Sequence, residues 1–84
     1  MPYLKPEQKE RIRNQLHLPP IAEPGELNFL ICEVVKHFLA NHIQPRYADY
    51  NDVLGAIEGA KLEVYRRLIA VYEDGKIAEN GDVF

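Results

Sequence analysis

The sequence contains no serine and no threonine among its 84 residues, and it has a single cysteine, Cys32. Hydroxyl nucleophiles of the serine or threonine type are therefore excluded outright. One thiol closes neither an intrachain disulfide nor a cysteine-based zinc site. We expect Cys32 to be buried in a helix, because a free cysteine usually packs as a small apolar side chain. Small domains made for an oxidising compartment usually carry several disulfides, so this composition favours the reducing cytoplasm.

Further absences narrow the class of protein. The chain has no block of lysine and arginine and a formal net charge of −3, which argues against binding a nucleic acid polymer. Its longest apolar run, residues 27–39, is interrupted by polar residues, whereas a membrane-spanning helix needs ~20 mostly apolar residues. The first residues include no apolar segment of the kind found in signal peptides, so we expect none. A length of 84 residues predicts one helical domain, 1–84.

Apolar spacing and proline positions predict an all-α chain of three helices. Proline suits the first turn of a helix, and the residue before a proline avoids the helical conformation. Pro6 therefore starts a first helix over 6–17, which ends before Pro19 and Pro20. A second helix is expected over 24–41, with an apolar stripe broad enough to imply burial of more than half its circumference. The stripe comprises Leu27, Leu30, Ile31, Val34, Val35, Phe38 and Leu39.

The third helix is the longest, expected over 51–74 with Asp49, Asn51 or Asp52 as its N-cap. Two neighbouring apolar faces are predicted along it. One comprises Val53, Ile57, Ala60, Val64, Leu68 and Val71, and the other Leu62, Tyr65, Ile69 and Tyr72. Two shorter helices do not obviously cover both faces, so we expect a homo-oligomer, most simply a twofold dimer with third helices packed together. Gly59 is one of two glycines four residues apart, a spacing that permits close helix packing, and we expect it at such a contact.

The C-terminal tail allows two conformations. Gly75 is expected to end the third helix, and the pair Asn80–Gly81 favours a tight turn. Residues 76–84 then form either a small hairpin or a further helical turn that stops at Gly81. We therefore expect a short irregular or hairpin tail.

The most suggestive group of side chains lies on the third helix. It consists of Lys61, Tyr65, Arg66, Arg67 and Tyr72. Arginine presents a planar fork to phosphate or carboxylate, and tyrosine presents a face for stacking. The group equally fits a solvated surface, because Glu58 and Glu63 stand one turn before Lys61 and Arg67 and favour ordinary ion pairs. Three interpretations stay open: structural ion pairs, an interface with a protein partner, and a site for an anionic small molecule.

Arg66 and Arg67 are expected to differ in role, because adjacent residues of a helix point about 100° apart. Arg67 has Glu63 one turn back and is expected to form an exposed ion pair with it. Arg66 lies on the flank shared with Leu62 and Ile69. Its stem can lie there on apolar surface while its head reaches an acidic group or an anionic ligand.

The sequence indicates no catalytic, metal or cofactor site. Glu33 and His37 are four residues apart, whereas carboxylate–histidine bundles use a three-residue spacing with further glutamates opposite, so we interpret them as a surface pair. Cys32 lies in a dense apolar run, which is unsuited to a Cys–His pair. Gly55 and Gly59 fall in a helical pattern that follows no strand, so they form no phosphate-binding loop. We therefore expect that the protein is not an enzyme.

Three motifs contain residues that helix periodicity does not require. They are GELN at 25–28, GAKLEVYRR at 59–67 and YEDGKIAENGDVF at 72–84. These motifs resemble those of a family of small uncharacterised proteins of bacteria, archaea and tailed phages. The resemblance implies a prokaryotic or phage cytoplasmic context, and it brings no catalytic residue because the family has no known function.

Together these patterns predict a small, non-enzymatic, oligomeric helical binding protein that acts by protein–protein interaction, with a host protein as a possible partner. The phage context rests on the resemblance alone. The alternative is a protein that sequesters a small anionic, nucleotide-like ligand with arginines and tyrosines of the third helix. Neither hypothesis requires a cofactor.

Overall fold

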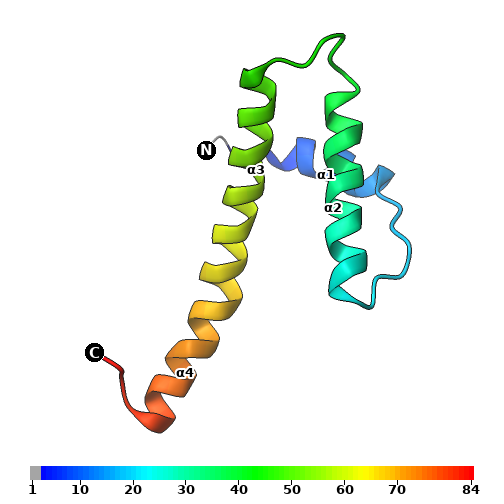
Figure 1. The fold of residues 1–84 in the computed structure, drawn as a ribbon. Helices are drawn as coiled ribbons and strands as arrows, with labels where there is room; N and C mark the ends of the chain where they lie inside the picture. The colour runs from blue at the N-terminus through cyan, green and yellow to red at the C-terminus, as the bar shows by residue number, and fades with distance from the viewer. Residues whose placement is uncertain (1–2) are drawn as a thin grey trace. The chain divides into compact units, whose positions relative to one another are not determined.

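The computed structural model of the chain describes residues 3–84 and contains helices but no strand in that range. Helix α1 spans Pro6–Gln15, α2 spans Pro24–Leu39 and α3 spans Tyr47–Val64 (Figure 1). The third helix then continues through a π-helical turn, η1 (Tyr65–Ile69), into α4 (Ala70–Asn80). The joined pieces form one helix of 34 residues, ~51 Å long at 1.5 Å per residue. The predicted all-α class, with three helices and a long third one, is confirmed.

All three helices start with the same hydrogen bond, which needs no serine or threonine. The side chain of the third helical residue accepts a hydrogen bond from the backbone N–H of the N-cap residue, which is one half of a capping box. A short hydroxyl side chain at the N-cap would accept from a different donor, the N–H of the third helical residue, and the sequence has no serine or threonine for that role. The pairs are Gln8 Oε1 with Lys5 N at 2.9 Å, Glu26 Oε1 with Glu23 N at 2.8 Å, and Asp49 Oδ2 with Arg46 N at 2.8 Å.

The third helix begins about one turn earlier than predicted. It starts at Tyr47 with Arg46 as N-cap, so the predicted N-caps Asp49, Asn51 and Asp52 are wrong. Asp49 does act at the start of the helix, but from the third helical position. A carboxylate there satisfies a backbone N–H at the N-terminus as a capping side chain would, and this allows the earlier start.

Prolines set the starts of the other two helices. Pro6 and Pro24 occupy the first helical position, as predicted. Helices α1 and α2 end at Gln15 and Leu39, two residues before their predicted ends.

The long helix passes through Gly75 and ends at Asn80, so the prediction that Gly75 terminates it is wrong. A glycine inside a helix is tolerated at about 1 kcal/mol relative to alanine. Gly81 terminates the helix instead, with φ at +87° and its N–H donating to the carbonyl of Ile77 at 2.8 Å. Of the two tail conformations, the helical extension is the one found, followed by the short irregular segment 81–84.

No apolar side chain is buried among residues 3–84, and Gly59 is the one buried residue of that range. The expected burial of the apolar stripe on α2 is not found: Leu30, Val35 and Leu39 are half-buried, and the other stripe residues are exposed. Cys32 is also exposed, so the prediction that it is buried is wrong. Helical periodicity shows which residues share a face, but only packing partners can cover that face.

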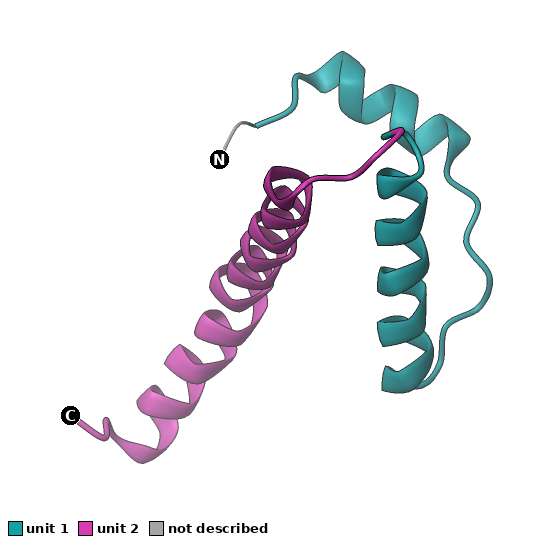
Figure 2. Cartoon of the chain, turned by 45° about the horizontal axis from the view of Figure 1, so that its top comes forward, with its two compact units in different colours: residues 1–42 teal, residues 43–84 magenta. Residues whose placement is uncertain are grey.

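The chain divides into two compact units at residue 42 (Figure 2). The first unit holds α1 and α2, joined by an extended segment, and the second holds the long third helix. In residues 3–84 no helix combines the length and the apolar character that crossing a membrane requires.

Candidate interaction site

The side chains singled out on the third helix lie on and beside its π-helical turn. In η1, Tyr65–Ile69, the N–H of Ala70 donates to the carbonyl of Tyr65, five residues earlier. Tyr65, Arg66 and Arg67 all belong to this turn. Single π-turns within α-helices occur frequently at functional sites.

The extra residue of the π-turn rotates everything after it by ~100° relative to an unbroken α-helix. Residues seven apart share a face of an α-helix, so the spacing of Tyr65 and Tyr72 predicts that they align. Across η1, residues eight apart align instead, which brings Tyr72 into line with Val64 and Ile57. The predicted second face, which starts at Leu62, is therefore divided at the turn. Tyr72 is separated from the other members of the predicted group.

Two of the three cations in the group form ion pairs along the helix. Lys61 Nζ lies 3.5 Å from Glu58 Oε1, and Arg67 Nε donates to Glu63 Oε2 at 3.3 Å. Both pairs have the predicted spacing, and three of the four side chains are largely exposed, while Glu63 is about half exposed. Exposed pairs of this kind contribute about 0.3–0.5 kcal/mol each. These two cations therefore have acidic neighbours already.

Arg66 is the exception. Its side chain is exposed, and it makes no ion pair and no hydrogen bond with any residue of 3–84. Tyr65, beside it, is 48% exposed, and Ile69, one turn further, is 44% exposed. The turn therefore presents one unpaired guanidinium next to apolar and aromatic surface.

Tyr72 has a different neighbour. Lys76 Nζ lies 5.6 Å from the centroid of the Tyr72 ring, within the range of a cation–π contact, and 3.4 Å from Glu79 Oε2. Tyr72 therefore belongs to a local cluster on α4, one turn beyond the π-turn.

Metal-binding geometry is not found in the described part of the chain: no three His, Cys, Asp or Glu side chains of residues 3–84 come together. Glu33, which could have joined His37, pairs with Lys36 Nζ at 2.9 Å.

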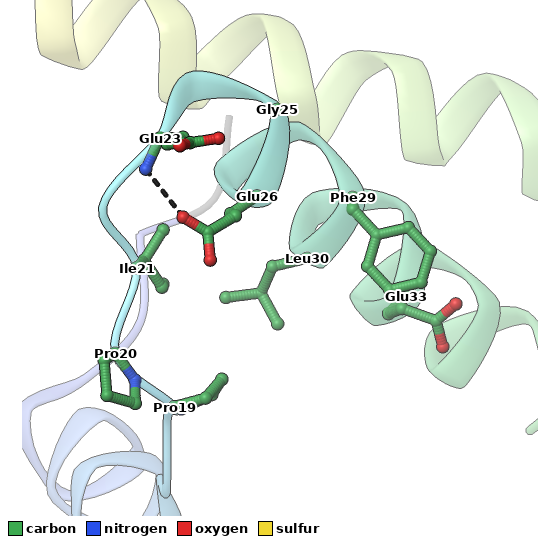
Figure 3. A pocket seen from close by; sticks show the side chains of 9 residues that line it. All are labelled: Pro19, Pro20, Ile21, Glu23, Gly25, Glu26, Phe29, Leu30 and Glu33. Atoms are coloured by element: carbon green, nitrogen blue, oxygen red, sulfur yellow. Dashed lines mark hydrogen bonds between the residues drawn. The ribbon is translucent and has the colours of Figure 1, made fainter.

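A hollow of about 520 Å³ in the first unit was not predicted from the sequence (Figure 3). It lies where the extended segment after Pro19 turns into α2. Three apolar side chains and three carboxylates supply most of its lining, and no cationic side chain of the described residues is among the lining residues. The six are Ile21, Phe29, Leu30, Glu23, Glu26 and Glu33.

The sequence does carry a signal for this hollow. Glu26, Phe29, Leu30 and Glu33 follow the spacing i, i+3, i+4 and i+7, which places them on one face of a helix. The spacing does not predict that the extended segment before α2 folds against this end of the helix. Glu26 fixes that junction, because its carboxylate also accepts a hydrogen bond from the N–H of Ala22 at 3.1 Å.

Comparison with known proteins identifies the family of the chain but no activity. No curated protein and no solved structure matches the chain. The profile of one family matches residues 1–83, nearly the whole chain. The chain therefore belongs to the family described as Domain of unknown function (DUF6899).

Proposed function

We propose that this protein is a non-enzymatic helical binding protein that works as a homo-oligomer and acts through protein–protein interaction. The proposal includes a reducing, cytoplasmic setting in a prokaryote or a phage-infected cell. The exposed, unpaired thiol of Cys32 and the lack of a second cysteine support that compartment.

One observation carries the proposal: large apolar side chains are exposed along every helix, and none is buried among residues 3–84. Phe29 and Leu54 are each 66% exposed, and Tyr72 is 65% exposed. Exposed apolar surface that forms a contiguous patch usually marks an interaction site. Domains of this size also have a limited core of their own, and association with further chains is a common supplement.

The lengths of the helices support the same conclusion. The third helix is ~51 Å long, whereas α2, with 16 residues, is ~24 Å and α1, with 10 residues, is ~15 Å. However they are placed, the two shorter helices together cannot run along the whole third helix. A second copy of the chain supplies the missing apolar surface.

The alternative function, sequestration of a small anionic ligand, has less support. Of the three cations on which it depends, Lys61 and Arg67 lie beside glutamates, and Arg66 alone is free. A nucleotide-like ligand would have to compete with those carboxylates for two of its three partners. Arg66 fits a carboxylate of a protein partner equally well.

Thermal unfolding followed by circular dichroism tests the proposal. For a protein that folds with its own copies, the midpoint rises with protein concentration, because association stabilises the folded state by mass action. We expect a clear rise between ~2 and ~200 μM, a range that brackets a micromolar dissociation constant. A midpoint that is the same at both concentrations would contradict the proposal.

A further inference from the structure

Two surfaces of opposite charge remain without a partner, one in each unit. The first is the hollow at the start of α2, whose lining includes three glutamates together with the apolar side chains of Phe29 and Leu30 (Figure 3). Within residues 3–84, Glu23 makes no ion pair, and Glu33 pairs only with Lys36, which does not line the hollow. The hollow is therefore both acidic and apolar.

The second surface is the π-turn η1. Arg66 is unpaired there, and Tyr65 and Ile69 beside it are about half exposed. This surface is therefore both basic and apolar. Its positive charge is complementary to the carboxylates of the hollow, and its apolar side chains can pack against the apolar residues there.

We propose that the hollow of one copy receives the π-turn of a second copy. In this arrangement the Arg66 guanidinium lies against one carboxylate of the hollow, Glu23 or Glu33, and Tyr65 packs against Phe29. Arginine suits the role because its planar fork donates two parallel hydrogen bonds to a carboxylate, while its stem and the tyrosine ring cover apolar surface. The proposal rests on the proposed function, since it names the surfaces through which the copies meet.

The competing basic segment of the chain is α1, and its composition disfavours it. Lys9, Arg11 and Arg13 on α1 form no ion pairs within residues 3–84. Ile12, however, is the one large apolar residue of Pro6–Gln15. A helix with so few apolar side chains cannot cover the apolar lining of the hollow. The π-turn η1, in contrast, has aromatic and aliphatic side chains next to its arginine.

A second copy, and not the hollow's own chain, is the favoured source of the π-turn. The third helix exceeds the combined length of α1 and α2, so these two helices cannot cover all of its apolar surface, whereas a second copy can. Each copy offers one hollow and one π-turn. In a twofold dimer each copy would contribute its hollow to one contact and its π-turn to the other.

Charge reversal in separate chains tests the contact. The basic variant carries Glu23→Arg and Glu33→Arg, and the acidic variant carries Arg66→Glu. Glu26 is left unchanged because its carboxylate holds the backbone at the start of α2. Each variant alone places like charges together at the contact, so we expect its dissociation constant to rise about 100-fold. The mixture of the two is expected to form mixed oligomers, seen by native mass spectrometry, with affinity close to that of the wild type.

Two controls separate the possible outcomes. Arg13→Glu reverses a free cation of α1 and is expected to leave association unchanged. If either reversed variant loses its helical circular dichroism, the milder changes Arg66→Gln and Glu23→Gln with Glu33→Gln replace them, with an expected rise of about 10-fold in the dissociation constant.

Each remaining result overturns one specific statement. If the wild type associates and the reversed variants associate equally well, the proposed contact is wrong and the proposed function stands. If the mixture fails to associate but a chain carrying all three reversals is restored, the π-turn binds the hollow of its own chain, which also contradicts the contact between copies. A wild type that is monomeric throughout contradicts the proposed function itself.

Discussion

Arg67 donates a hydrogen bond from Nε to the carboxylate of Glu63 at 3.3 Å, while its neighbour Arg66 has no polar partner within residues 3–84. Both residues lie in the same π-turn, and both side chains are exposed. The pair with Glu63 is the ion pair expected for Arg67, because that contact is set by spacing along one helix. The difference between the two arginines gives the first prediction.

Replacing each arginine by alanine is expected to have different effects. Arg67→Ala removes one exposed pair and is expected to change the free energy of unfolding by no more than about 0.5 kcal/mol. Arg66→Ala removes a group that the proposed contact desolvates, and we expect it to weaken self-association by about 1.5 kcal/mol or more. Chemical denaturation measures the free energy of unfolding and sedimentation equilibrium measures self-association, and both variants are compared in both measurements. Equal, small effects would show that the two arginines belong to the same solvated surface.

The π-turn itself can be tested by deletion. Removing Leu68 takes out the extra residue, so the helix is expected to become a continuous α-helix with its helical content kept. Because the π-turn already accommodates the extra residue, Tyr72 and the later apolar residues keep their alignment with Val64, and only the wide turn that presents Arg66 is lost. We expect unchanged far-ultraviolet circular dichroism together with weaker association. Leu68→Ala is the matched control, because it removes the same apolar side chain and keeps the π-turn.

Two glycines of α3 are expected to respond in opposite directions to alanine. A methyl group at Gly55 meets no atom within 4 Å, so Gly55→Ala is expected to stabilise the protein by up to about 1 kcal/mol through helix propensity. Gly59 is buried, and a methyl group there is expected to destabilise by about 1–3 kcal/mol. Chemical denaturation compares the two variants. Clear stabilisation by Gly59→Ala would contradict a close contact at that position.

The end of the long helix offers a further pair of substitutions. Gly81 has φ at +87°, a conformation that other residues rarely adopt, so Gly81→Ala is expected to destabilise the last helical turn by about 1–3 kcal/mol. Gly75 is helical and open to solvent, so Gly75→Ala is expected to stabilise by up to about 1 kcal/mol. Amide hydrogen exchange around Ile77 reads both effects. Equal protection in the two variants would argue against Gly81 as the residue that ends the helix.

The order of the elements was accessible from the sequence because local signals determine it. Prolines set two helix starts, at Pro6 and Pro24, and apolar spacing indicated three helices. The start at Tyr47 was missed because Asp49 acts from the third helical position, a use of aspartate that N-cap preferences do not distinguish. Gly75 is wrongly predicted as the helix end because glycine is common just past a helix end but is also tolerated inside a helix. The local sequence does not distinguish the two positions.

The candidate site was less accessible, for two physical reasons. A periodic pattern assumes a constant 3.6 residues per turn, so the π-turn and the displacement of Tyr72 from Tyr65 were not predicted. Burial depends on what packs against a face, so the exposure of Cys32 and of the α2 stripe did not follow from periodicity. Pairs within one helix, such as Glu63 with Arg67, were predicted correctly because they need no tertiary information.

The central claim is that the apolar surface left exposed by one chain is covered by another copy. Light scattering coupled to size-exclusion chromatography, at ~100 μM eluted protein, measures this most directly, because a micromolar interface is filled at that concentration. We predict a mass that is a whole multiple, at least twofold, of the 9.7 kDa chain. A mass of 9.7 kDa at that concentration would contradict the account.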